Sequence, residues 1–77
     1  MGLYNTVCND TQKFSGNQEA QDHAARWAWD RFGGDYANTF VCWLLRLEEA
    51  EQEFIYRNGY KTCERNFEEW LAREEAR

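Results

Sequence analysis

Apolar residues recur at the spacing of an α-helix along most of this chain, and no proline interrupts them. In three segments they return every three or four residues, which places them on one side of a helix. Residue types that begin or end helices bound these segments: Asn17, Gly33-Gly34, Asp35, Asn58-Gly59 and Thr62. The pattern predicts helices at about 17–32, 36–57 and 62–75.

The fold class follows from the short connections between these helices. Helices joined by a few residues pack as antiparallel neighbours, so we expect an all-α, three-helix bundle that forms one domain over residues 1–77. Residues 1–14 are polar and rich in Asn and Thr. We expect them to form an irregular N-terminal arm, held to the bundle by its few apolar side chains.

Aromatic side chains are abundant for a domain of this size, since 13 of the 77 residues are aromatic and 4 of these are Trp. A small domain needs such residues, because each aromatic side chain can bury about 150–250 Å². Helical phase assigns six of them to one core: Trp27, Phe40, Trp43, Phe54, Phe67 and Trp70. It leaves four outside that core: Trp29, Phe32, Tyr56 and Tyr60.

These remaining aromatics have three interpretations. Exposed Trp and Tyr are preferred anchors of protein interfaces, so Trp29, Tyr56 and Tyr60 are predicted to contact a protein partner. Alternatively, the N-terminal arm covers them with Tyr4 and Phe14. A third interpretation is a homodimer that buries a second apolar face of the bundle.

Charge is distributed unevenly along the chain. The net charge is −5, with five acids and four bases in residues 1–47 but nine acids and five bases in residues 48–77. This balance argues against direct binding of nucleic acid or of an anionic membrane surface. An acidic surface instead attracts basic partners.

The acidic residues of the second and third predicted helices fall into two rows. Glu48, Glu49 and Glu53 occupy the outer side of the second helix, and Glu64, Glu68 and Glu75 line one flank of the third. Carboxylates one helical turn apart stand about 5–6 Å from each other, comparable to neighbouring phosphates of a nucleic-acid strand. The alternative is a solvated helix face with ion pairs such as Glu53–Arg57 and Glu69–Arg73.

In size, acidity and aromatic content the chain resembles the small inhibitors that phages encode against host defence, of the anti-CRISPR or anti-restriction type. The Glu48–Glu53 and Glu64–Glu75 clusters and the Trp27-Ala28-Trp29 segment carry this resemblance. Those inhibitors share no common motif, so no residue role transfers to this chain. The resemblance implies a mode of action, in which the protein binds a nuclease or a CRISPR surveillance complex where nucleic acid would otherwise lie.

The sequence gives only weak indications of metal binding or catalysis. Cys8, His23, Cys42 and Cys63 could form a zinc site, but their spacings of 15, 19 and 21 residues lack the close pairs typical of zinc ligands. A nucleophilic cysteine needs a nearby base, and His23 is the only histidine. No glycine-rich phosphate loop precedes a helix. We therefore predict a non-enzymatic protein with no cofactor and no metal.

The sequence predicts a small acidic protein that binds and blocks a basic, nucleic-acid-handling complex. Glu48, Glu49, Glu53, Glu64, Glu68 and Glu75 supply the charge, and Trp29, Tyr56 and Tyr60 supply the anchors. The alternative is a structural or assembly protein that acts as a homodimer. Three unpaired cysteines and no apolar signal region predict a cytoplasmic location, and no stretch approaches the about 20 apolar residues of a membrane span.

Overall fold

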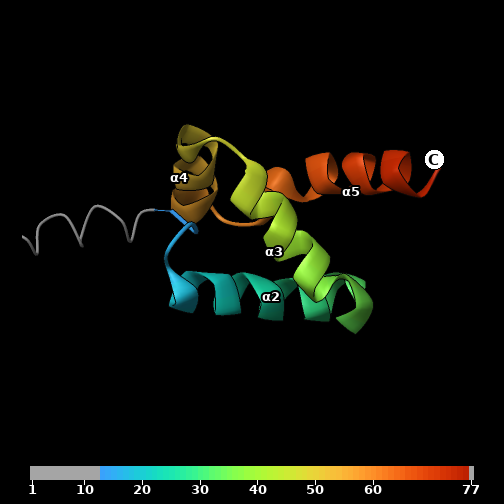
Figure 1. The fold of residues 1–77 in the computed structure, drawn as a ribbon, viewed down its shortest axis with the longest axis horizontal. Helices are drawn as coiled ribbons and strands as arrows, with labels where there is room; N and C mark the ends of the chain where they lie inside the picture. The colour runs from blue at the N-terminus through green and yellow to red at the C-terminus, as the bar shows by residue number, and fades with distance from the viewer. Residues whose placement is uncertain (1–12, 77) are drawn as a thin grey trace, which may run out of the picture.

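The computed structural model describes residues 13–76, and these residues are helical with no strand (Figure 1). The elements are α2 (Gln18–Phe32), a 3₁₀ turn η1 (Gly34–Tyr36), α3 (Ala37–Arg46), α4 (Glu49–Asn58) and α5 (Lys61–Glu75). Helix α3 packs on α2 and runs obliquely between α2 and α5, while α4 lies at the end where the chain enters α2. The all-α prediction is confirmed. Residues 1–12, most of the predicted arm, lie outside the described residues.

The first predicted helix agrees with α2 within one residue. Asn17 caps it, because the Asn17 side-chain oxygen accepts a hydrogen bond from Ala20 N at 3.1 Å. Gly33 ends it with φ of 110°, and its N–H donates to the Trp29 carbonyl. Between these ends, Ala20, Ala24 and Ala28 form the buried stripe, and these small side chains let α3 approach α2 closely.

The predicted second helix over residues 36–57 is wrong, because these residues form two helices. Helix α3 ends at Arg46, and α4 begins at Glu49. Leu47 and Glu48 are extended, with ψ of 158° and 156°. Glu48 and Glu51 then form a capping box that starts α4, in which the Glu51 carboxylate accepts from Glu48 N at 3.4 Å. Glutamate favours a continuous helix by propensity, so this stretch gives no conspicuous stop signal. The described residues therefore form four α-helices rather than three.

Two predicted N-caps are also wrong. Asp35 lies inside η1, and α3 begins at Ala37 without a side-chain cap. Thr62 lies in the first turn of α5, where its hydroxyl donates to the Gly59 carbonyl at 2.6 Å. Thr62 therefore stabilises the turn that precedes α5 rather than the first N–H groups of that helix.

The core is a cluster of aromatic rings around Phe40, which is fully buried on α3. Its ring lies 5.0–6.4 Å from the rings of Trp27, Phe32, Trp43, Tyr60 and Phe67. Phe32 and Tyr60 therefore belong to this core, contrary to the prediction. Phe54, predicted to be core, is 56% exposed. The break at Leu47 explains this reversal, because helical phase cannot be carried from α3 into α4.

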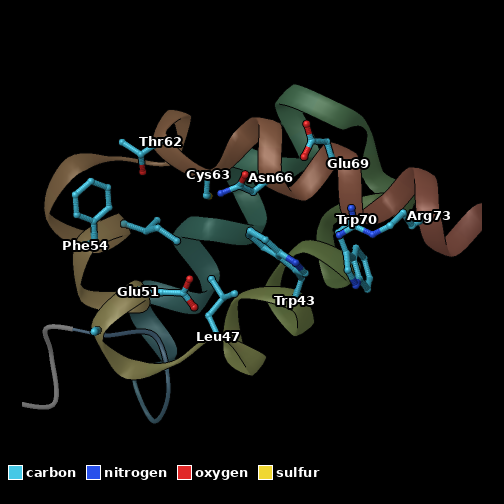
Figure 2. A pocket seen from close by; sticks show the side chains of 12 residues that line it. Trp43, Leu47, Glu51, Phe54, Thr62, Cys63, Asn66, Glu69, Trp70 and Arg73 are labelled. Atoms are coloured by element: carbon cyan, nitrogen blue, oxygen red, sulfur yellow. The ribbon is translucent and has the colours of Figure 1, made fainter.

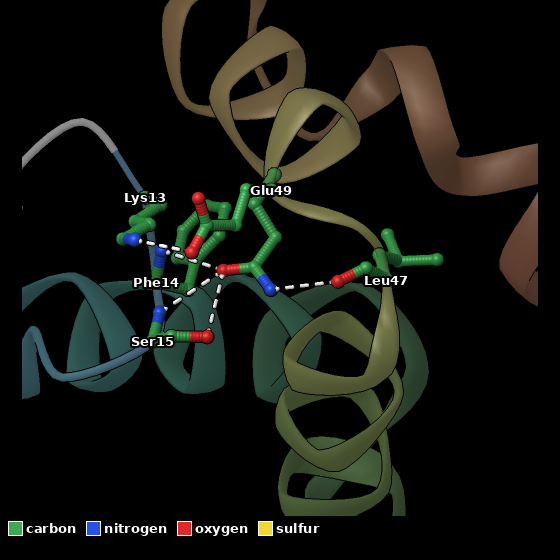
Figure 3. Close-up of polar contacts among 6 residues, drawn as sticks. Lys13, Phe14, Ser15, Leu47 and Glu49 are labelled. Atoms are coloured by element: carbon green, nitrogen blue, oxygen red, sulfur yellow. Dashed lines mark hydrogen bonds and ion pairs between the residues drawn. The ribbon is translucent and has the colours of Figure 1, made fainter.

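A buried amide ties the start of the described chain to α4 (Figure 3). The Gln52 side chain is 1% exposed, and its oxygen accepts from Phe14 N at 3.0 Å, Ser15 N at 3.0 Å and the Ser15 hydroxyl at 3.2 Å. Its nitrogen donates to the Leu47 carbonyl at 3.0 Å, which is the last carbonyl before the capping box of α4. One side chain thus fixes both the entry segment and the helix break.

We expect Gln52→Leu to lower the free energy of unfolding by about 2–4 kcal/mol, because it leaves the N–H groups of Phe14 and Ser15 without their acceptor. Gln18→Leu is the matched control, since Gln18 is exposed and its side chain bonds Asp22 one turn away. Urea unfolding followed by tryptophan fluorescence measures both variants. Equal midpoints for the two variants would show that the Gln52 hydrogen bonds do not stabilise the fold.

Candidate partner-binding site

The predicted acidic rows do not form one continuous surface. Glu64 faces α2, where its carboxylate forms an ion pair with the Arg31 guanidinium, although the buried oxygen Oε2 lacks hydrogen-bond geometry. Only 15% of the Glu64 side chain is exposed, so it is not part of an outward row. Glu68 on the same helix is exposed, and within residues 13–76 it makes no ion pair. Residues one turn apart on α5 thus meet different surroundings.

The other predicted acids also have local partners. Glu49 pairs with Lys13 at 2.6 Å, and Glu53 pairs with Arg57 at 2.7 Å as predicted. Glu48 caps α4. Glu75 accepts a hydrogen bond from the Tyr36 hydroxyl at 3.2 Å, and this carboxylate raises the pKa of Tyr36. Exposed pairs of this kind contribute only about 0–1 kcal/mol each, so partner contacts can replace them at low cost.

Glu69 differs from the predicted pairing. Its carboxylate lies 3.5 Å from Arg65, one turn earlier on α5, rather than beside Arg73. Both side chains are largely exposed, and the distance is long for a charge-assisted hydrogen bond. This arrangement leaves the Glu69 carboxylate accessible to a cationic partner.

The predicted anchors lie in three different environments. Trp29 is 61% exposed near the end of α2, where its ring lies over Gly34. Tyr56 is 44% exposed and packs edge-on against Phe14, with ring centroids 5.8 Å apart. Tyr60 belongs to the core. The entry segment therefore covers part of the aromatic surface through Phe14, which is 1% exposed, while Trp29 and Tyr56 keep exposed area.

A groove runs between α5 and the α3–α4 corner (Figure 2). Its volume is about 470 Å³, and its apolar lining comes from Trp43, Leu47, Ala50, Phe54, Ile55, Cys63 and Trp70. Phe54 and Thr62 lie at one end, and Trp70 and Arg73 lie at the other. The helix break positions this groove, because α4 turns away from the line of α3 at Leu47 and opens a space that α5 does not fill.

Carboxylates stand on both walls of this α4–α5 groove. Glu51 projects from α4, and Glu69 projects from α5 beside Asn66. Among residues 13–76, Arg73 is the one base that lines this groove. The groove thus combines an apolar floor with an acidic rim, which suits an apolar anchor flanked by basic groups.

Three of the residues that form this groove were missed as site residues. Glu51 and Glu69 were not among the predicted contacts, and Phe54 was assigned to the core. No conspicuous sequence signal marked the start of α4, because the capping box at Glu48–Glu51 has Glu at the N-cap, where the sequence signature of such a box has Ser or Thr. Had α4 been treated as a separate helix, its phase could have been assigned independently of α3.

A second groove, of about 860 Å³, lies between the start of α2 and the α4–α5 turn. His23 Nδ1 lies 3.0 Å from the Tyr60 hydroxyl on its wall, and their rings are 5.7 Å apart. Glu19, Asp22 and Arg26 add charges of both signs to the lining. Its apolar lining comes from Ala20, Ile55, Tyr56 and Tyr60.

Burial changes the acidity of two core groups. Desolvation raises the pKa of the Cys63 thiol to about 11 and that of the Tyr60 phenol to about 12. Cys63 also donates to the Tyr60 carbonyl, with Sγ 3.3 Å from that oxygen. A buried thiol with a raised pKa is a poor nucleophile, which assigns Cys63 to the core rather than to chemistry.

The residues considered as zinc ligands were Cys8, His23, Cys42 and Cys63, and Cys8 lies outside the described residues. Cys42 is exposed on α3 and Cys63 is buried on α5. Across residues 13–76, no three His, Cys, Asp or Glu side chains are grouped to hold a metal ion. None of the helices α2–α5 is long and apolar enough to cross a membrane.

The chain matches no protein-family model, no curated protein and no solved structure.

We expect the burial of Cys63 to make the free energy of unfolding fall as the pH rises from 9 to 11. The fold keeps Cys63 protonated up to a pKa of about 11 instead of 9.0, so alkaline pH favours the unfolded thiolate. Tyr60 adds a further fall between pH 10 and 12.

Urea midpoints at pH 7, 9, 10 and 11 measure this dependence in the wild type, in Cys63→Ala and in the matched control Cys42→Ala. Cys63→Ala flattens the fall between pH 9 and 11, and Cys42→Ala retains it. Identical pH slopes for wild type and Cys63→Ala would contradict the assignment to Cys63.

Proposed function

We propose that this protein is a non-enzymatic, acidic inhibitor that binds a basic surface of a nucleic-acid-handling protein complex through the α4–α5 groove. The observation that supports it most strongly is the combination of an apolar floor with carboxylates on both walls. Phe54, with 56% of its surface exposed at one end of this groove, is the proposed anchor. Anchors of this kind, ringed by polar contacts, carry most of the free energy of protein association.

Electrostatics supports a basic partner. Residues 48–77, which include both groove walls, carry nine acids and five bases. The exposed acids among them are Glu48, Glu49, Glu51, Glu68, Glu69 and Glu75. Complementary charge accelerates encounter with a basic surface and disfavours acidic partners. The same surface repels nucleic acid, so a complex formed here excludes nucleic acid from the partner's basic site.

Inhibition through the α4–α5 groove does not require a continuous row of carboxylates that imitates phosphates. Glu64 pairs with α2, so the charges that remain available flank an apolar groove. Competition then arises from occupation of a basic surface and not from copying the phosphate spacing. The free thiols of Cys42 and Cys63 suit a reducing compartment such as the cytoplasm.

The alternative function, assembly as a homodimer, draws support from the exposed area of Trp29 and Phe54. Two copies that meet through α4 and α5 would bring like charges together, because this segment has an excess of acids. Light scattering distinguishes the alternatives. A mass that stays at the monomer value of 9.3 kDa as the concentration rises would contradict an obligate dimer.

We expect immobilised wild-type protein to retain basic, nucleic-acid-binding proteins from nuclease-treated host lysate, and added DNA or RNA to displace them. Glu51→Lys with Glu69→Lys reverses the charge of the groove rim and is expected to weaken retention about tenfold or more. Mass spectrometry identifies the retained proteins and quantifies each variant against wild type.

The matched control is Glu19→Lys with Glu74→Lys, which changes the net charge equally away from the α4–α5 groove lining. It should retain the same proteins nearly as well as wild type. Equal losses for both double variants would indicate a general charge effect. Retained proteins that nucleic acid fails to displace would contradict inhibition by competition.

A further inference from the structure

We infer that the α4–α5 groove receives a basic amphipathic α-helix of the partner, with its C-terminus toward Arg73. This inference rests on the proposed function, since it names the segment of the basic partner that the groove engages. It is carried by the arrangement of an apolar floor, a carboxylate on each of two walls and the base Arg73 at one end.

The groove geometry favours a helix over an extended segment. Helices α3, α4 and α5 supply the lining, and their backbone N–H and C=O groups already bond within helices. No strand edge exists in residues 13–76 to pair with an extended peptide. A bound helix satisfies its own backbone groups, so it can enter an apolar groove without leaving N–H or C=O groups unpaired.

The apolar floor extends along the groove rather than forming a single pit. Phe54 lies at one end, Trp43 near the middle and Trp70 at the other end (Figure 2). Successive contacts along a line match the apolar face of a helix, whose side chains recur at i, i+3 or i+4, and i+7. The three aromatic rings would therefore receive separate anchors from one helical face.

The walls determine the charge of the occupant. Glu51 and Glu69 stand on opposite walls, so basic residues on both sides of the apolar face of the bound helix would meet a carboxylate. Within the part of the chain that the structure describes, Glu69 is held only by a long, exposed contact with Arg65. Exchange of this contact for one with a partner Lys or Arg costs little.

Arg73 determines the direction. It lies beside Trp70 at the end of the groove opposite Phe54. The C-terminus of a helix carries a partial negative charge, and its N-terminus carries a partial positive charge. A bound helix therefore places its C-terminus near Arg73 and its N-terminus near Phe54 and Thr62. A second copy of this chain fits less well, because its own α4 and α5 are acidic.

The test uses the full chain and a synthetic helix of about 18 residues, with Leu at i, i+3, i+4 and i+7 and Lys flanking the Leu face. The four indole N–H signals provide an internal control, since Trp43 and Trp70 line the groove whereas Trp27 and Trp29 do not. We expect the signals of Trp43 and Trp70 to shift on titration and those of Trp27 and Trp29 to stay in place.

Matched peptides and variants test each part of the inference. A peptide of the same composition, with Leu scattered around the helix, should bind the wild-type protein about tenfold more weakly than the amphipathic peptide does. The amphipathic peptide should bind the Phe54→Ser variant about tenfold more weakly than it binds the wild type. Glu51→Gln with Glu69→Gln should weaken binding about three- to tenfold. A spin label at the C-terminus of the peptide should broaden the Trp70 signal, and one at its N-terminus should broaden the Thr62 amide.

Several results would overturn the inference. If the peptide with scattered Leu binds as tightly as the amphipathic peptide, charge alone attracts them. If the Trp29 signal shifts, the peptide binds outside the groove. If the C-terminal spin label broadens the Thr62 amide and the N-terminal label broadens the Trp70 signal, the bound helix runs in the opposite direction. Indole shifts that depend on protein concentration without peptide would assign the groove to a second copy. If the peptide leaves Trp43 and Trp70 unchanged while Glu51→Lys with Glu69→Lys still abolishes capture of basic proteins, the helix inference fails and the proposed function stands.

Discussion

The Gln52 amide is the interaction on which the arrangement of this domain depends. Buried at 1% exposure, it accepts hydrogen bonds from Phe14 and Ser15 and donates to the Leu47 carbonyl. Each of these backbone groups lies outside a regular helix, so it needs a hydrogen-bond partner that helix geometry does not provide. The amide provides it in a site that excludes water, so the entry segment, the α3–α4 break and the position of α4 are coupled.

The position of α4 in turn decides what the aromatic residues do. Phe40 gathers rings from α2, α3 and α5 into a single cluster, and Phe14 extends the cluster on the side of α4. Because α4 starts afresh at Glu49, Ile55 faces inward and Phe54 faces outward. The core is complete without Phe54. The exposed ring is therefore available to a partner, beside a groove whose floor is an extension of the core itself.

The acidic residues of this structure fall into two groups, one paired within the domain and one exposed. Glu49 with Lys13 and Glu64 with Arg31 join elements that are distant in sequence, and their carboxylates are engaged within the domain. Glu51 and Glu69 stand at the rim of the groove, and Glu68 is exposed on α5. The acidic character of the chain thus serves both folding and recognition. The proposal of a basic partner depends on the second group of acids.

The sequence by itself determined the all-α class, the ends of α2 and the acidity of the C-terminal half. These features depend on local patterns: apolar spacing, the Asn17 cap, the glycines at 33 and 34, and composition. Only the tertiary structure decided that Glu48 interrupts the second helix, because a capping box made of two glutamates is indistinguishable by propensity from continuing helix. Phe54, Tyr60 and Glu64 were misplaced for a related reason. Their surroundings depend on where α4 and α2 lie in space, and the long-range contacts of Gln52 and Arg31 determine that position.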